Sequence, residues 1–359
     1  FDTPAHIKQA AIDAINAGFT KYTAVEGIVE LKDAIIAKFR RDNGIEYQRN
    51  QILVSSGAKQ TVYNVCSAVL DAGDEAIIPA PYWVSYPDMV MLADGLPVMP
   101  SADARTGYKI SAKQLAAAIT PKTRLVIFNS PCNPTGAAYT RTELQAFGEV
   151  LGQNPRVLIA TDDMYEHIYW GEEPFCSLLT ACPHLYNRTI TINGASKVYA
   201  MTGWRIGYCG GPAEIITAMA TIQGQSTSNP SSISQKAALA ALNGDQTCVI
   251  EMNREFKKRH DFVVAGLNSL PGVSCLKGAG TFYAFANVEG AMKAMGCHDD
   301  HEFTEFLLTT AGVAVVPGSG FGAPGHIRIS FATSMKQLES AIERMAKALM
   351  GKRLAVGNG

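Results

Sequence analysis

From about residue 50 to residue 250, short apolar runs alternate with segments whose apolar residues recur at helical spacing. Residues 51–56 (QILVSS) predict a buried strand, and residues 57–73 predict the helix that follows, with Gly73 expected to end it. The buried face of this helix is expected to consist of Val62, Val65, Cys66, Val69 and Leu70. Such alternation is typical of a mostly parallel sheet covered by helices.

The alternation continues along the chain. Further strands are predicted at residues 75–81, 123–131, 156–165 and 189–194. Two helices should begin with a capping box, in which two side chains three residues apart satisfy each other's backbone amides. The two pairs are Ser111 with Gln114 and Thr140 with Glu143.

After about residue 250 the pattern changes, because a long charged helix at 251–270 precedes several apolar runs that are no longer separated by long helices. Strands are predicted at 281–287 (TFYAFAN), 311–318 (AGVAVVPG) and 326–332 (HIRISFA), and a closing helix at 335–350. We therefore expect a large domain over residues 1–250 and a smaller α+β domain over 251–359. The opening FDTPAHIKQA resembles the middle of a domain, so we expect that some N-terminal residues are missing.

Composition narrows the range of functions. The 359 residues are 47% hydrophobic and carry a formal net charge of −1, so no bulk positive field attracts nucleic acid or an anionic membrane. No apolar run approaches the roughly 20 residues of a membrane span. Eight cysteines without a CxxC pair predict reduced thiols and a cytoplasmic location.

Polar residues follow several of the predicted strands, at the edge where an open α/β sheet binds its ligands. Gly57 and Ala58 open a helix, so their backbone amides could cradle a phosphate, although such a turn is also common without a ligand. Asn133 follows the strand at 123–131 in a loop that Pro131 and Pro134 stiffen, and a structural Asn-Pro turn is the alternative.

Two acids and a phenol lie at the end of the strand predicted at residues 156–165. Asp162 and Tyr165 lie three residues apart, and an acid buried there needs a cationic partner or a neutral form. Asp163 could be the buried acid instead, and the spacing leaves that choice open.

Lys197 follows the strand at 189–194, and Arg205 comes eight residues later. A lysine in a pocket at this edge would have its amine pKa lowered by burial and by nearby cations, which Schiff-base formation requires. A single lysine after a loop is usually a surface residue. The other polar strand ends expected to converge on the same pocket favour the functional interpretation.

Four segments together, 80–87 (APYWVSYP), 130–136 (SPCNPTG), 161–167 (TDDMYEH) and 193–208 (NGASKVYAMTGWRIGY), resemble class I aminotransferases of the aspartate aminotransferase type. These are enzymes of fold type I that depend on pyridoxal 5'-phosphate (PLP). The likeness extends over nearly the whole chain. It implies a mostly parallel seven-stranded sheet covered by helices, with a smaller α+β C-terminal domain.

The resemblance also implies roles for single residues. Lys197 would bind PLP as a Schiff base and act as the base of the 1,3-proton shift, while Asp162 would pair with the ring nitrogen. The remaining cofactor contacts implied are Tyr165 and Asn133 at the ring oxygen, Trp83 on the ring face, and Arg205 with the Gly57 and Ala58 amides at the phosphate. Tyr22 resembles the tyrosine that reaches the phosphate of the neighbouring subunit, which implies a homodimer with shared sites.

The substrate is implied by two basic residues. Arg328 matches the arginine that clamps the α-carboxylate, and Lys59 matches the lysine that meets the distal carboxylate in a bacterial aspartate/prephenate aminotransferase subgroup. Trp83 and Asn133 would also border the substrate. Aspartate and glutamate, with oxaloacetate and 2-oxoglutarate, are the implied substrates, and prephenate is an alternative. Ala58 departs from the subgroup, which often has glycine there.

Other functions are weaker interpretations. A PLP-dependent lyase would share the cofactor residues, but Lys59 argues against it. A regulator's sensor domain would carry a DNA-binding helix-turn-helix, and a dinucleotide oxidoreductase a GxGxxG motif, and neither pattern is present. No metal site is expected, because the cluster CHDDH at 297–301 does not have a familiar zinc spacing. His167 is expected to be a packed or surface residue.

Overall fold

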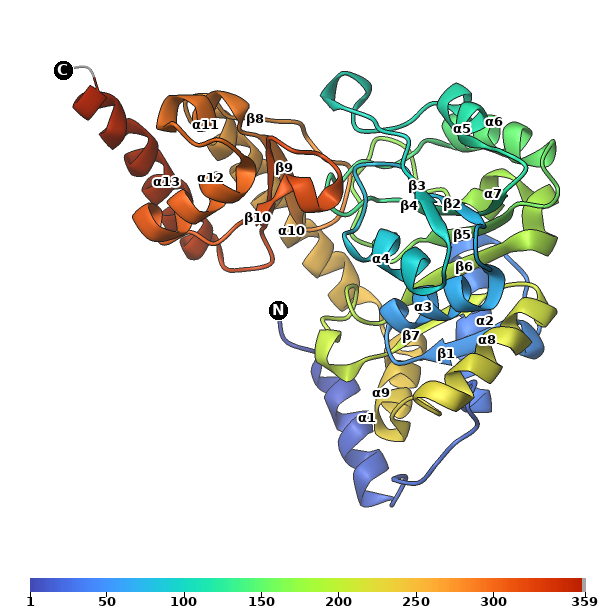
Figure 1. Ribbon diagram of the computed structural model, residues 1–359. Helices are drawn as coiled ribbons and strands as arrows, with labels where there is room; N and C mark the ends of the chain where they lie inside the picture. The colour runs from blue at the N-terminus through green and yellow to red at the C-terminus, as the bar shows by residue number, and fades with distance from the viewer. Residues whose placement is uncertain (357–359) are drawn as a thin grey trace.

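The computed structural model describes residues 1–356, with side chains to residue 351. Its main feature is a seven-stranded sheet in the order β1-β7-β6-β5-β4-β2-β3 (Figure 1). The strands are β1 (Ile52–Ser55), β2 (Glu75–Ile77), β3 (Leu96–Val98), β4 (Thr123–Asn129), β5 (Leu158–Asp162), β6 (Thr189–Gly194) and β7 (Gly207–Gly210). The seven strands and the helices around them confirm the predicted fold.

One strand runs against the others. β7 pairs antiparallel with both β1 and β6, whereas β2 to β6 pair in parallel where they are neighbours. Gly207 at the start of β7 therefore lies opposite both Ser55 and Gly194, which end their strands. As a result, the residues just before β7 lie at the edge of the sheet where the parallel strands end.

Helices cover both faces of this sheet. One face packs against α3 (Ala58–Val69), α4 (Ser85–Leu92) and α8 (Ala213–Ser226), whose buried residues include Val62, Val90 and Met219. The helices on the opposite face are α1 (Ala5–Asn16), α2 (Val29–Lys38), α5 (Ala112–Ala118), α6 (Arg141–Gly152), α7 (Leu178–Ala181) and α9 (Ser232–Asn243). The sheet is thus buried on both sides, which explains its nearly continuous apolar strands.

A four-stranded antiparallel sheet in the order β10-β11-β9-β8 belongs to a second part of the molecule, at the left of Figure 1. Its strands are β8 (Ser274–Cys275), β9 (Tyr283–Asn287), β10 (Val316–Pro317) and β11 (His326–Ser330). It packs with α10 (Thr247–Asn268), α11 (Glu289–Met295), α12 (Asp300–Phe306) and α13 (Met335–Val356). The helix α10 joins the two parts, because Val249 belongs to the core of the large sheet and Phe256 to that of the small one.

Local predictions were mostly confirmed. Both capping boxes are present, at the starts of α5 and α6, and the expected face of α3 is buried. The predicted end of α3 was wrong, because the helix stops at Val69 rather than at Gly73. Leu70 turns to an extended backbone, and its side chain then packs beside Gly95. The strand predicted at 311–318 is reduced to Val316–Pro317, since a helical turn extends to Ala311.

Candidate active site

A cavity of about 290 Å³ lies where the carboxyl ends of the large sheet meet the small sheet. Polar and aromatic side chains line it from both sides. They are Lys59, Trp83, Tyr86, Asn129, Asn133, Asp162, Tyr165, Ser196, Lys197, Thr202, Arg205, Tyr283 and Arg328, with Ala58 and Met164 completing the wall. Its size is at the lower end of the range of small-molecule sites.

The sheet explains why these residues converge. Asn129, Asp162 and Gly194 end the neighbouring strands β4, β5 and β6. Asn129 pairs with Asp162 in the β4–β5 register, so the loops that leave these strands start side by side. Asn133, Tyr165 and Lys197 each lie three or four residues beyond a strand end, which places them around one cavity.

Of the two neighbouring acids at the end of β5, Asp162 is the one that lines the cavity. Asp162 lines the cavity, where its Oδ2 accepts a 2.6 Å hydrogen bond from Tyr86 and its Oδ1 a 3.2 Å bond from the Met164 amide. Asp163 is also buried, but its Oδ1 accepts a 2.6 Å bond from Thr161, outside the cavity. Burial raises the pKa of Asp163 to about 8, so this second acid is neutral in the folded protein at pH 7.

Lys197 is held in a largely buried position. Its Nζ lies 5.4 Å from the centre of the Phe282 ring, and its side chain lines the cavity that Asp162 also lines. Burial lowers the pKa of Lys197, and the charge of Arg205 lowers it further, while Asp162 opposes the shift. A lysine with a lowered pKa offers a neutral amine, which is the form that attacks a carbonyl.

Arg205 and the start of α3 form an anion cradle. Gly57 has φ of +89° and a Cβ built there would lie 2.2 Å from Arg205 Nη2, so only glycine lets the guanidinium approach. Arg205 Nη1 donates a 2.9 Å hydrogen bond to the Thr202 carbonyl, which aims the side chain. The first amides of a helix generally lack a carbonyl partner within it, and Ala58 and Lys59 at the start of α3 line the same cavity.

Arg328 comes from β11 of the small sheet, and its Cζ lies 4.4 Å from the centre of the Tyr283 ring and 4.8 Å from that of Phe321. Its Nη1 donates a 3.0 Å hydrogen bond to Asn133 Oδ1. Its Nε is buried and has no hydrogen-bond acceptor among the described residues. A buried donor without an acceptor is costly, so this guanidinium edge is suited to a carboxylate ligand.

Lys59 stands at the mouth of the same cavity. Its Nζ lies 4.9 Å from the centre of the Trp83 ring and donates a 3.1 Å hydrogen bond to Ser85 Oγ. The ammonium is therefore held over an aromatic face on the side that Trp83 lines, and it stays exposed to solvent.

Sequence reasoning missed six residues of the cavity, and three of them hold predicted residues in place. Tyr86 bonds Asp162, and Asn129 donates to the Asp162 carbonyl at 2.9 Å while accepting from the Asn133 amide at 2.8 Å. Tyr283 supports Arg328. Asn129 ends a predicted strand and could have been found by its position, whereas nothing local marks the other two.

Tyr22 is the one predicted residue that lies elsewhere. It is 91% exposed and lines a separate hollow, together with residues from 227 to 233. Its expected contact with a neighbouring subunit stays a prediction.

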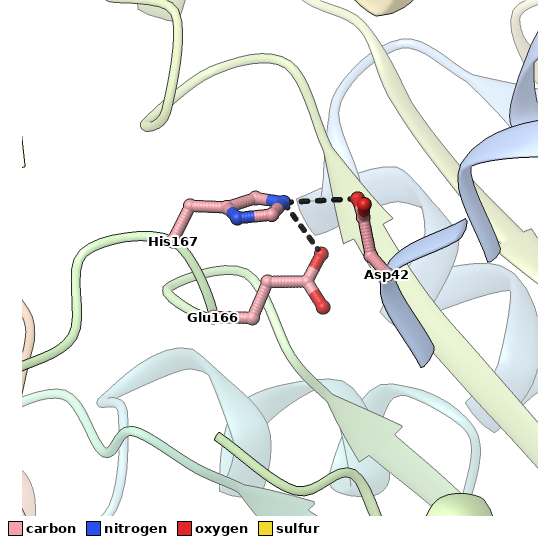
Figure 2. Close-up of side chains that lie close together, drawn as sticks. All are labelled: Asp42, Glu166 and His167. Carbon is pink, nitrogen blue, oxygen red and sulfur yellow. Dashed lines mark hydrogen bonds and ion pairs between the residues drawn. The ribbon is translucent and has the colours of Figure 1, made fainter. Parts of the chain in front are cut away.

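A second cluster of polar side chains lies outside the cavity (Figure 2). His167 Nε2 is 3.1 Å from Asp42 Oδ2 and 3.4 Å from Glu166 Oε1. The spacing of these atoms would suit a metal ion. However, Lys38 Nζ already pairs with Glu166 Oε1 and lies 3.7 Å from Asp42 Oδ2. The cluster therefore already holds a cation of its own and anchors the segment that carries Tyr165.

Three side chains of the CHDDH cluster have structural partners. Asp299 caps α12 by accepting from the Glu302 amide at 2.8 Å, and buried Asp300 accepts from the Ser319 amide at 2.7 Å. His301 Nε2 lies 2.9 Å from Ser319 Oγ.

Among the helices described, none is long and apolar enough to cross a membrane.

Comparison with known proteins agrees with this geometry. Residues 1–345 match the family described as aminotransferase class I and II. The aspartate/prephenate aminotransferase of Nitrosomonas europaea is 55% identical over 97% of this chain and 89% of its own length.

Two solved structures show the same fold. The crystal structure of the aspartate aminotransferase from Rhizobium meliloti has a TM-score of 0.93 and 49% identity, over 98% of this chain and 89% of that one. The aspartate aminotransferase of Thermus thermophilus with maleate has a TM-score of 0.90 and 41% identity, over 97% and 89%. The chain belongs to the class I and II aminotransferase family.

Proposed function

We propose that this protein is a PLP-dependent aspartate aminotransferase, which moves an amino group between aspartate or glutamate and oxaloacetate or 2-oxoglutarate in a ping-pong reaction. The observation that carries the proposal is that Lys197, Arg328 and Lys59 line one cavity. A reactive amine, a half-buried guanidinium and an exposed ammonium in one place match an amino acid with two carboxylates.

The residues present fit PLP. The Arg205 and Gly57 cradle offers an anion site for the phosphate, and Asp162 offers a buried acceptor for a protonated ring nitrogen. The Tyr165 hydroxyl and the Asn133 amide nitrogen are donors for the ring oxygen, since Asn133 Oδ1 is already used by Arg328. Trp83 supplies an aromatic face, and Lys197 the amine that would bind the aldehyde.

When bound, PLP supplies an electron-withdrawing ring that stabilises negative charge at the substrate Cα. The protein supplies the proton transfer. Lys197, with its pKa lowered by burial and by Arg205, is the base that takes the proton from Cα. Arg328 orients the substrate by its α-carboxylate, and the cavity walls limit the access of water to the reacting atoms.

The substrate side rests on two charges at different depths. Arg328 is half-buried against the rings of Tyr283 and Phe321, whereas Lys59 is exposed at the mouth. An α-carboxylate at Arg328 would thus place a distal carboxylate toward Lys59. The relatives named aspartate aminotransferases, one of them with the dicarboxylate maleate, support this assignment.

Prephenate is a second candidate, because it is also a dicarboxylate and a 55% identical relative is named an aspartate/prephenate aminotransferase. The exposed position of Lys59 favours prephenate, since a bulky distal group can reach solvent there.

We also propose a homodimer in which Tyr22 completes the neighbouring subunit's phosphate site, and a cytoplasmic location.

We propose that the chain works as two domains, residues 1–250 and 251–359, joined within α10. The last three residues, 357–359, lie outside the described part of the chain.

A panel of half-reactions tests the proposal. The PLP form is mixed with aspartate, glutamate, phenylalanine or alanine, and the amino form with 2-oxoglutarate or prephenate, while the cofactor absorbance is followed. Aspartate and glutamate should react fastest. Equal rates for the neutral amino acids would contradict the role of Lys59, and keto acid formed without an acceptor would indicate a lyase. The Lys197→Ala variant should lose the absorbance band of the bound cofactor, and an unchanged band would overturn the assignment.

A further inference from the structure

Asp162 has a phenol as its closest partner. Tyr86 donates a 2.6 Å hydrogen bond to Asp162 Oδ2, although the two residues are 76 positions apart in the chain. The second carboxyl oxygen, Oδ1, accepts from the Met164 amide at the longer distance of 3.2 Å. Tyr86 is 1% exposed, so water does not compete for this bond.

Burial and hydrogen bonding act on Asp162 in opposite directions. Burial raises the pKa of Asp162, while the bonds from Tyr86 and the Met164 amide and the charge of Lys197 lower it. Tyr86 itself remains a phenol, because burial and the neighbouring carboxylate raise its pKa well above the ordinary value. The hydroxyl proton therefore stays on the Tyr86 oxygen, and Tyr86 donates the hydrogen bond to the Asp162 carboxylate.

We propose that Tyr86 is a positioning residue that keeps Asp162 ionised and aimed into the cavity, so that Asp162 can pair with the protonated ring nitrogen of PLP. This inference rests on the proposed function. The geometry supports it further, because the Tyr86 ring also meets Trp83 edge-on, with the ring centres 5.2 Å apart at 87°. One side chain at the start of α4 thereby locates both the residue for the ring face and the residue for the ring nitrogen.

Other titratable groups surround Asp162, from every element packed against it. They are Tyr86 of α4, Cys132 after β4, Asp163 and Tyr165 after β5, and Lys197 after β6. Burial raises the pKa of Asp163 to about 8, and burial raises the pKa values of Cys132 and Tyr165 too, so these three are neutral at pH 7. The charged neighbour is Lys197, which lowers the pKa of Asp162 less than the hydrogen bond from Tyr86 does. Tyr86 is therefore the strongest stabiliser of the carboxylate among these groups.

The experiment measures PLP binding to the cofactor-free full chain, by quenching of tryptophan fluorescence, from about pH 5 to about pH 9. Affinity should fall at low pH, where Asp162 gains a proton and can no longer pair with the ring nitrogen. In Tyr86→Phe the carboxylate loses its donor and gains its proton at higher pH. We call the fall of PLP affinity at low pH the acid limb of the profile. In Tyr86→Phe this acid limb should move up by about one pH unit, and PLP should bind about tenfold more weakly within it.

Tyr47→Phe is the matched control. Tyr47 is also buried, and its hydroxyl bonds Thr191 at 3.1 Å away from the cavity, so its loss should leave the pH profile of PLP binding in place. A uniform loss of affinity at all pH values in Tyr86→Phe, or an unchanged profile, would overturn the inference. If the unmodified protein does not bind PLP, the proposed function fails with it.

A second variant keeps the shape of the side chain and covers the case in which Tyr86→Phe does not fold. Tyr86→3-fluorotyrosine retains the ring and the hydroxyl but makes the phenol a stronger donor. The acid limb of PLP binding should then move to lower pH, opposite to the shift in Tyr86→Phe. A limb that stays in place or moves up would contradict the role assigned to Tyr86.

Discussion

Arg328 Nη1 donates a 3.0 Å hydrogen bond to Asn133 Oδ1, and this bond joins the small sheet to the loop after β4 of the large sheet. Asn133 is held in turn by Asn129, whose side chain accepts from the Asn133 amide and donates to the Asp162 carbonyl. The proposed carboxylate clamp and the proposed partner of the ring nitrogen are thus connected through two asparagines.

The clamp predicts a cost for replacing Arg328. In Arg328→Lys the point charge remains, but the planar fork that could bond both carboxylate oxygens is lost. We expect kcat/KM to fall about 100-fold for every amino acid substrate, because one to two charged hydrogen bonds are removed. Steady-state kinetics measure this. Arg105→Lys, at an exposed arginine whose ion pair is with Asp103, should leave the rates unchanged, and equal losses in both variants would refute the clamp.

Lys59 should matter only for substrates with a second carboxylate. In Lys59→Gln we expect kcat/KM for aspartate to fall about tenfold or more, since one charged contact is lost at an exposed position. The rate with phenylalanine should stay the same and serves as the internal control. A parallel loss for both amino acids would show that Lys59 supports the cavity rather than the distal carboxylate.

The Gly57 turn predicts a steric effect on the anion cradle. In Gly57→Ala the new Cβ meets Arg205 Nη2, so the guanidinium must move and PLP affinity should fall about tenfold or more. Gly73→Ala is the matched control, because Gly73 has the same φ of +89° with open space around it. This control should lose about 1–2 kcal/mol of stability through backbone strain and bind PLP normally. Normal PLP binding by both variants would show that the cradle tolerates the displacement.

Buried Asp163 predicts a pH-dependent stability. Its pKa is raised by burial to about 8 when folded, against about 3.9 when unfolded, so the folded chain binds the extra proton between these values. The stability that this proton contributes is complete below about pH 3.9 and is lost as pH rises toward 8. Asp163→Asn should therefore lose less stability over this range than the unmodified protein, by up to about 1.4 kcal/mol per pH unit.

Urea unfolding at several pH values between about 4 and about 8 measures the difference. Asp103→Asn, at an exposed acid that is paired with Arg105, should not flatten the pH dependence in the same way. Parallel curves for the unmodified protein and Asp163→Asn would show that Asp163 is ionised in the folded state.

The sequence by itself determined the elements, the edge of the sheet that carries the chemistry, and the family. Helix caps, apolar periods and strand ends depend on neighbouring residues, so Ser111, Thr140 and the loop positions of Asn133 and Lys197 could be inferred from local pattern. Motif order then connected these positions to one kind of enzyme.

Only the tertiary structure decided which acid enters the cavity and what holds it there. Neighbouring residues of a strand point to opposite faces, and the spacing of Asp162 and Asp163 does not show which face the cavity occupies. Tyr86 reaches Asp162 from another helix, and Tyr283 reaches Arg328 within the small sheet. Such contacts arise when distant elements pack together, so no local pattern in the sequence encodes them.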